Sequence, residues 1–130
     1  MPYLLDSTWL VEYLRGDPKF VQAIRERQPD RLAMSIVTLA ELYSGVARST
    51  DRAKAEREVQ RVVSQVAVLG IDDTIARIWG REDARLTLAG QKIGDVDLFI
   101  AATALAHDLT LCSQNRKHFE RVPGLKLVSL

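Results

Sequence analysis

The sequence predicts an α/β domain in which a mainly parallel sheet is covered by helices on both faces. Short apolar runs alternate along the chain with longer segments of helical periodicity, and this alternation is typical of such sheets. The 130 residues suffice for one compact domain with a substantial core but not for two. Of these residues, 47% are apolar and 27% are charged, which is the usual composition of a soluble globular protein.

The first half of the chain shows this alternation clearly. Strands are expected at residues 3–5 and 32–36, and helices at residues 7–14, 18–28, 39–46 and 51–65. The stretch "GDP" at residues 16–18 ends the first helix, and Pro18 suits the first turn of the next one. Leu39, Leu42 and Val46 recur at the spacing of one helix face, which predicts the third helix.

The second half of the chain continues the same pattern. Strands are expected at residues 66–71, 110–112 and 125–128, and helical segments at about residues 73–90, 93–109 and 117–121. Asp72 or Asp73 can cap the first of these helices, and Gly90 suits its end. Residues 96–106 are apolar on nearly every side of a helix, which predicts that this helix is buried.

Polar side chains follow three of the expected strands, at the edge of the sheet where ligand sites form. The carboxyl ends of parallel strands share one edge, so residues that follow different strands become neighbours in space. These residues are Asp6 after the first strand, Thr38 and Glu41 after the second, and Ser113 and Asn115 after the fourth. Asp97 begins the helix that leads into the fourth strand, and we expect it at the same edge.

Each of these acids also has a purely structural interpretation. Asp6 can cap the first helix. Thr38 and Glu41 fit a capping box, S/T-x-x-E, in which each side chain satisfies a backbone donor of the other residue. Asp95 suits the N-cap of the helix at 93–109, and Asp97 would then benefit from the helix dipole. Taken singly, each acid fits a cap as well as a site.

Asp97 is the acid that a structural role explains least well. It falls on the apolar stripe of Ile100 and Ala104, where a carboxylate is costly unless a positive group meets it. No Lys or Arg lies within one turn in sequence, so a metal ion is the expected partner. Carboxylates select Mg²⁺ or Mn²⁺, and zinc is not expected because His107 and His118 are isolated in the sequence.

The single cysteine and the N-terminal residues bear on the location of the protein. Cys112 cannot form an internal disulfide, and it lies in an apolar run, which fits a buried thiol and an intracellular location. The start "MPYLLDSTW" lacks the basic region of a secretory signal. No apolar run approaches the about 18 residues that a membrane span needs. We therefore expect a cytoplasmic protein that does not enter a membrane.

Three stretches of the sequence resemble the PIN-domain ribonucleases and, within that group, the VapC-like toxins of toxin–antitoxin pairs. These stretches are "YLLDSTWLVEYL" at 3–14, "SIVTLAELYSGV" at 35–46 and "IGDVDLFIAATALAHDLTLCSQNRKHFERVPGL" at 93–125. The last block is long and specific, whereas the first two are short. Together the three stretches make the resemblance extend over nearly the entire chain.

The resemblance assigns roles to individual residues. Asp6, Glu41 and Asp97 match the acidic metal-binding and catalytic positions of the family, and Asp97 stands three residues before the "IAA" triplet. Asn115 occupies the fourth polar or acidic position, where an Asn weakens the case for a second tightly held metal. Ser113 stands where Thr or Ser is usual.

Further residues receive expected roles from the same resemblance. Asp95 is a supplementary acid that either assists the metal site or caps its helix. The residues expected to position or bind the RNA substrate are Thr38, Ser113, Asn115 and Arg116, with Lys117 next to them. The expected mechanism is in-line attack of water on the scissile phosphate, with charge neutralised by Mg²⁺ or, in its place, Mn²⁺.

The resemblance also implies the fold and the partners of the protein. The fold would be a three-layer α/β/α PIN-like domain over residues 1–130, assembled as a small homodimer. A cognate antitoxin would wrap the toxin with its tail and push a basic side chain into the acidic pocket. An Arg or Lys can replace a cation among carboxylates that otherwise repel one another.

Three other functions remain open on the sequence. The first is a PIN nuclease of RNA processing or decay without a toxin role. The second is a receiver-like regulatory domain that binds Mg²⁺ and is phosphorylated, although such a domain would need an acidic pair after the first strand and an acceptor Asp after the third. Asp72 and Asp73 after the third strand look more like helix caps. The third is an interaction module with a degraded site.

Overall fold

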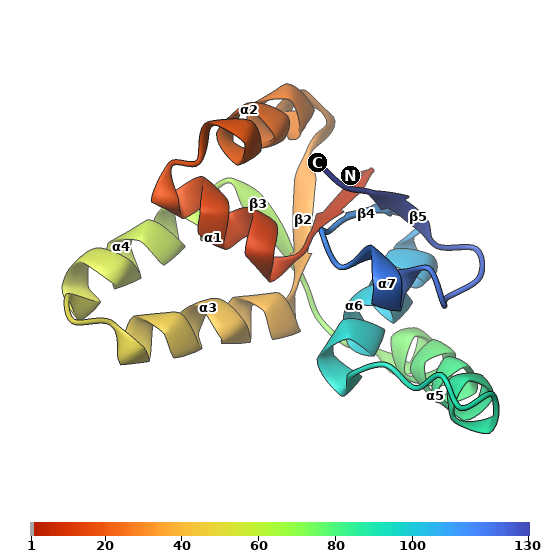
Figure 1. Ribbon diagram of the computed structural model, residues 1–130. Coiled ribbons are helices and arrows are strands. Elements are labelled where there is room, and N and C mark those ends of the chain that lie inside the picture. The colour runs from red at the N-terminus through yellow and green to blue at the C-terminus, as the bar shows by residue number, and fades with distance from the viewer. Residues whose placement is uncertain (1) are drawn as a thin grey trace.

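Five short strands form one parallel sheet at the centre of the molecule (Figure 1). The computed structural model of the chain describes residues 2–130. The strands are β1 (Tyr3–Leu5), β2 (Leu32–Ser35), β3 (Val66–Leu69), β4 (Thr110–Cys112) and β5 (Lys126–Val128). Their order across the sheet is β3-β2-β1-β4-β5, and every neighbouring pair is parallel. The predicted mainly parallel sheet is confirmed.

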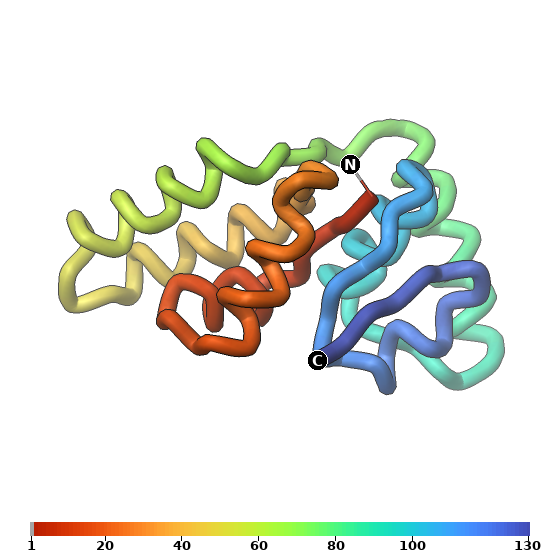
Figure 2. Tube along the Cα trace, turned by 90° about the horizontal axis from the view of Figure 1, so that it is seen from above, coloured from red at the N-terminus to blue at the C-terminus, as the bar shows by residue number. Residues whose placement is uncertain are grey.

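Helices cover both faces of this sheet, as the sequence predicts (Figures 1 and 2). They are α1 (Ser7–Arg15), α2 (Pro18–Arg27), the short 3₁₀ helix η1 (Gln28–Asp30), α3 (Ile36–Arg48), α4 (Arg52–Val63), α5 (Asp73–Leu88), α6 (Asp95–His107) and α7 (Arg116–Phe119). α1, α2 and α4 pack on one face, and α5, α6 and α7 pack on the other. The described chain therefore has the three layers α/β/α.

Neighbouring strand residues contribute to two separate cores, one on each face of the sheet. Leu5 and Met34 belong to the core with α1, α2 and α4, whereas Leu4 and Ala33 belong to the core with α5 and α6. All four side chains are fully buried. Successive side chains of a strand point to opposite faces, and a parallel sheet that is covered on both sides therefore uses continuous apolar runs.

The first turn of α3 differs from the expectation. Ser35 is the N-cap, because its Oγ accepts a hydrogen bond from the Val37 backbone N–H at 3.1 Å. The strand therefore ends at Ser35, and Thr38 lies inside the first turn of the helix. The interpretation of Thr38 and Glu41 as a capping box is wrong.

The first turn of α6 also differs from the expectation. Gly94 is the N-cap and makes no side-chain cap bond, so the interpretation of Asp95 as the cap is wrong. Asp95 and Asp97 both lie in the first turn, where the positive end of the helix dipole favours carboxylates. The rest of α6 is buried as predicted, and Leu98, Ile100 and Ala101 are at most 1% exposed.

The remaining elements lie close to their expected positions. Asp72 caps α5 through a 2.9 Å bond from the Ile75 backbone N–H, and Pro18 is in the first turn of α2. β3 and β5 are shorter than predicted, and α7 begins one residue earlier, at Arg116. Within residues 2–130, none of the helices has the length and apolar character needed to cross a membrane.

Candidate active site

The order of the strands places a switch point between β1 and β4. From β1 the chain continues to β2 and β3 on one side, and it then crosses to β4 and β5 on the other side. Ligand sites in open parallel sheets form at such points, outside the carboxyl ends of the strands. Asp6 directly follows β1, and Ser113 directly follows β4. Both residues therefore lie at the edge where a site is expected.

Asp6 is held at this edge by two hydrogen bonds. Its Oδ1 accepts from the Ser7 backbone N–H at 2.8 Å, which makes Asp6 the N-cap of α1, and its Oδ2 accepts from the Ser113 hydroxyl at 2.7 Å. Burial raises the pKa of Asp6, the two hydrogen bonds oppose this rise, and the negative charge of Asp97 adds to it. Asp6 is thus a helix cap and also a buried carboxylate close to a second acid.

The absence of a cation beside Asp6 distinguishes it from Glu82, another buried acid. Both residues are 6% exposed. Glu82 is neutralised by Arg85, whose NH2 group lies 3.1 Å from Glu82 Oε1. None of the ion pairs formed within residues 2–130 includes Asp6. A buried carboxylate without a positive partner is costly, so Asp6 is the acid that would gain more from a bound cation.

Two nitrogen atoms from the segment after β4 converge on Asp97. Asn115 Nδ2 lies 2.9 Å from Asp97 Oδ2, and His118 Nδ1 lies 3.1 Å from the same oxygen. His118 is isolated from other His and Cys residues in the sequence, but in the folded chain it contacts Asp97. The Asp97 side chain is 25% exposed, so this carboxylate is fixed on one oxygen and remains accessible.

Ser113 connects the two acids into one network. Its Oγ donates to Asp6 Oδ2 and accepts from the Asn115 backbone N–H at 3.1 Å, and the Asn115 side chain then reaches Asp97. Ser113 itself is fully buried. The network joins the ends of β1 and β4 to the first turn of α6, so the positions of Asp6 and Asp97 are mechanically coupled.

Glu41 adds a third carboxylate to this group, from α3. Partial burial raises the pKa of Glu41, and the negative charges of Asp6 and then Asp97 raise it further, while a hydrogen bond from the Ser7 side chain opposes the rise. Glu41 is otherwise exposed. The structure thus brings together three acids from different elements: Asp6 after β1, Glu41 in α3 and Asp97 in α6. Their ionised carboxylates carry charge of the same sign.

The acidic group is open rather than a closed metal cage. Within residues 2–130, no three acidic, His or Cys side chains are arranged so that they alone could hold an ion. The donor chemistry still fits a hard divalent cation, because the mutual repulsion of Asp6, Glu41 and Asp97 would be relieved by positive charge. Mg²⁺ and Mn²⁺ retain several waters and need few carboxylates, so an open group of oxygen ligands suits them.

The other residues expected at the site lie less centrally. Thr38 is fully buried, and its Oγ1 has no hydrogen-bond partner. Asp95 is exposed, and its charge is not among the causes that shift the pKa of Asp6 or Glu41. Arg116 pairs with Glu120 at 3.3 Å and also contacts Ser129.

His118 is the residue near the site that the sequence reasoning missed. A weak signal was present, since His118 and Asn115 are three residues apart and would share one side of a helical turn. The direction of that side depends on how the chain turns after β4, and the sequence pattern alone does not give it.

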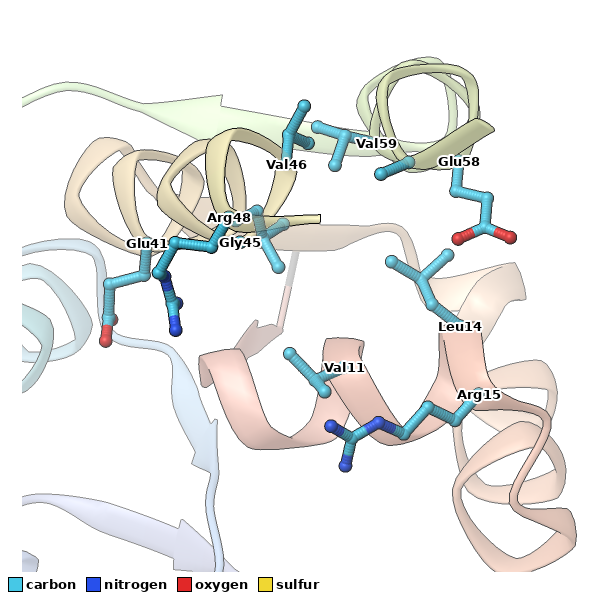
Figure 3. Close-up of a pocket in the computed structure, with 11 residues that line it drawn as sticks. Val11, Leu14, Arg15, Glu41, Gly45, Val46, Arg48, Glu58 and Val59 are labelled. Carbon is cyan, nitrogen blue, oxygen red and sulfur yellow. The ribbon is translucent and has the colours of Figure 1, made fainter. Parts of the chain in front are cut away.

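A groove begins beside Glu41 and runs between α1, α3 and α4 (Figure 3). It has a volume of 420 Å³. Val11 and Leu14 of α1 and Val46 of α3 contribute apolar side chains to its lining, and Glu41 lies at one end. The charged residues that also line it are Arg15, Arg48 and Glu58. A cavity of this composition suits a segment with both apolar and charged side chains.

The fold and the site together define a class of protein, namely parallel α/β domains that gather carboxylates at the switch point of the sheet. The chain belongs to the PIN-domain family, because the family model described as PIN domain matches residues 3–125. This membership confirms the resemblance seen in the sequence, and it excludes a receiver-like domain. In agreement, Asp72 caps α5, and Asp73 pairs with Arg77 at 2.7 Å.

Known proteins resemble the chain over almost its full length. Ribonuclease VapC1 of Haemophilus influenzae (strain R2866) is 31% identical over 128 residues, which are 97% of this chain and 96% of that protein. The structure of VapBC2 from Rickettsia felis, bound to a DNA fragment from its promoter, has a TM-score of 0.93 and 26% identity, covering 100% of this chain and 99% of that chain. VapBC-5 from Mycobacterium tuberculosis, a member of the VapBC family of toxin–antitoxin systems, has a TM-score of 0.73 and 27% identity over 100% of this chain and 98% of that chain.

Proposed function

We propose that this chain is a metal-dependent endoribonuclease that acts as the toxin of a toxin–antitoxin pair. The observation that carries the proposal is the hydrogen-bonded connection from Asp6 through Ser113 and Asn115 to Asp97. It holds carboxylates from separate elements at the switch point. The similarity to a ribonuclease supports the reaction, and the similarity to a toxin–antitoxin structure supports the biological role.

Asp6, Glu41 and Asp97 are the proposed ligands of Mg²⁺, and Mn²⁺ is the proposed substitute. When bound, the ion would neutralise charge on the scissile phosphate and make the attacking water more acidic. Asp95 keeps only an outer role in this proposal, because it is exposed and its charge does not shift the pKa of Asp6 or Glu41. Asn115 in place of a fourth acid favours a single ion.

The three carboxylates differ in how firmly they are held, and this suggests separate roles. Asp6 accepts two hydrogen bonds, and Asp97 has two nitrogen neighbours on one oxygen. These two acids are therefore suited to fixing the geometry. Glu41 is exposed and less constrained. We assign to the Glu41 carboxylate the acceptance of a proton from the attacking water, since it is exposed and a general base must come within hydrogen-bond reach of the proton that it removes.

The RNA backbone would be held by residues that surround the acidic group. The guanidinium of Arg116 has five N–H donors, of which the contacts to Glu120 and Ser129 use only part. Lys117 next to it is exposed. Asn115 and Ser113 contribute indirectly by holding the acids. Thr38 is fully buried, so we assign it no direct contact with the RNA.

A cognate antitoxin is the proposed protein partner, with one of its segments in the groove between α1, α3 and α4. The groove combines apolar walls with charged residues and ends at Glu41. A basic side chain carried to that end would neutralise the acidic group and exclude a metal ion. Occupation of the groove would therefore inhibit cleavage directly.

An RNA cleavage assay tests the proposed reaction. The purified chain should cut a structured RNA with Mg²⁺ or Mn²⁺ and should stop when EDTA is added. Cleavage that persists in EDTA would contradict the metal-dependent mechanism. Induced expression without the antitoxin should halt growth, whereas normal growth with an active nuclease present would favour a role in RNA processing.

Several properties of the whole protein belong to the same proposal. We place residues 1–130 in a single PIN domain, with a homodimer as the active assembly and the cytoplasm as its location. Light scattering of the purified chain tests the dimer. Cell fractionation tests the location.

A further inference from the structure

His118 lies beside Asp97 in a way that core packing does not explain. Its side chain is 40% exposed, whereas the next residue, Phe119, is 1% exposed and fills the core under α7. His118 Nδ1 is nevertheless 3.1 Å from Asp97 Oδ2, across the contact between α7 and α6 (Figure 1). The imidazole is therefore only partly buried, and it makes a specific polar contact with one of the three acids.

The distances around Asp97 place two nitrogen atoms against one carboxylate oxygen. Asn115 Nδ2, His118 Nδ1 and Asp97 Oδ2 form a triangle with sides of 2.9, 3.0 and 3.1 Å. A carboxylate oxygen accepts hydrogen bonds, so a ring nitrogen bonds to Asp97 Oδ2 only when it carries the hydrogen. We take Nδ1 of His118 to carry it, so that Asn115 and His118 both donate to Asp97 Oδ2. The 3.0 Å distance between Asn115 and His118 then separates two donors and is not a hydrogen bond.

We propose that His118 is a positioning residue for Asp97: together with Asn115 it fixes Oδ2 and thereby leaves Oδ1 of Asp97 oriented for the metal ion. This inference rests on the proposed metal-dependent function. His118 and Asn115 are carried by the same short segment, α7 and its N-cap, so one element sets both donors. Three residues separate β4 from α7, and within them the Asn115 backbone N–H donates to Ser113 Oγ. The segment that contacts Asp97 is therefore hydrogen-bonded to the residue that holds Asp6.

The expected magnitude follows from how such outer contacts act in other metal sites. Partners that hydrogen-bond to a metal ligand typically change metal affinity or activity by about 10–100-fold when they are removed. Since Asn115 remains in place, we expect removal of the His118 donor to weaken metal affinity by about tenfold, at the lower end of that range.

The experiment compares two replacements of His118 in the full chain. His118→Phe keeps a flat ring but removes the donor, and His118→Asn places an amide nitrogen near the position of Nδ1. Mn²⁺ binding is measured by calorimetry at one fixed pH for all variants, and RNA cleavage is measured over a range of Mn²⁺ concentrations. His107→Phe is the matched control, because His107 is the other histidine of the chain and lies exposed at the end of α6.

The inference expects a specific pattern of results. His118→Phe should bind Mn²⁺ about tenfold more weakly, and cleavage should recover towards the wild-type rate at high Mn²⁺. His118→Asn should retain most of the affinity, and His107→Phe should match the wild type. A merely structural role would lower melting temperature without shifting the metal requirement.

The opposite results would overturn the inference in distinguishable ways. Equal Mn²⁺ affinity in folded His118→Phe and wild type would reject the positioning role and leave the proposed nuclease intact. A wild-type chain that binds no Mn²⁺ would reject both. If His118→Phe does not fold, the Mn²⁺ affinity of His118→Asn decides. An affinity as weak as that of Asp97→Asn would show that an amide donor does not replace the imidazole, and this would reject the positioning role.

Discussion

Ser113 donates a 2.7 Å hydrogen bond to Asp6 Oδ2, although the two residues are 107 positions apart in the chain. Both side chains are buried, and the backbone on either side is tied together by the bond from the Asp6 N–H to the Cys112 carbonyl at 3.0 Å. A hydroxyl in this position stabilises the ionised carboxylate and fixes its direction. The parallel pairing of β1 and β4 therefore brings Ser113 to Asp6, and the hydrogen bond between them orients the carboxylate.

Ser113→Ala should reduce RNA cleavage while the fold is retained. The change removes the donor to Asp6, and the pKa of Asp6 should rise further above its ordinary value because that hydrogen bond lowers it. We expect a loss of metal affinity or activity of about 10-fold or more. Cleavage rates at several Mg²⁺ concentrations measure it. Ser113→Thr keeps the hydroxyl and should stay close to wild type, and equal loss in both variants would contradict this reasoning.

Asp6→Asn should abolish cleavage and stabilise the metal-free protein at neutral pH. Burial raises the pKa of Asp6 in the folded state above its ordinary 3.8. Between the ordinary pKa and this raised pKa, the folded state binds more protons than the unfolded state. Stability therefore falls as the pH rises through that interval, and ionised Asp6 costs stability above it. In EDTA, the variant should melt higher than wild type at pH 7, and the difference should vanish below the ordinary pKa.

Asp17→Asn is the matched control for that substitution. Asp17 caps α2 by accepting from the Lys19 backbone N–H at 3.0 Å, as Asp6 caps α1, but it lies outside the acidic group of Asp6, Glu41 and Asp97. Its replacement should leave cleavage unchanged. A melting temperature of Asp6→Asn below that of wild type at pH 7 in EDTA would mean that the cap bond outweighs the relief of charge.

The sequence predicted the acids better than it predicted their neighbours, and the reason is physical. The rule that parallel strands share a carboxyl edge brings Asp6 and Glu41 together without any detail of side-chain direction. His118, by contrast, reaches Asp97 only because α7 turns in a particular way after β4. A four-residue helix leaves too little periodicity to read that direction from the sequence.

The errors at helix starts have a related cause. Ser35 and Thr38 are both good caps by residue type, and the end of β2 decided between them. At α6, Gly94 adopts extended backbone at the cap position, with φ −62° and ψ 150°, and Asp95 begins the helix. At α3, local preference offered two starts, and the end of β2 selected Ser35.

Asn115→Asp should make the metal-free protein less stable and its response to metal larger. The change replaces a donor 2.9 Å from Asp97 Oδ2 with a second negative oxygen, so the two carboxylates repel unless a cation is present. Melting in EDTA should occur at lower temperature than for wild type, and Mn²⁺ should restore more stability. A ligand at 100 times its Kd adds about 2.7 kcal/mol. Asn115→Leu removes the donor without adding charge, so Mn²⁺ should not restore extra stability to it. An equal increase in melting temperature with Mn²⁺ in both variants would exclude this explanation.

Gly45→Met should weaken binding of the cognate antitoxin, whereas Gly80→Met should not. Both glycines are inside helices, α3 and α5, and a Cβ at either would meet no atom within 4 Å. Each change should stabilise its helix by about 0.5–1 kcal/mol. Gly45 lines the groove that begins beside Glu41 and Gly80 does not, so only the Met introduced at position 45 would enter the groove. Copurification and calorimetry measure the binding, and equal affinity of both variants would remove the groove from the interface.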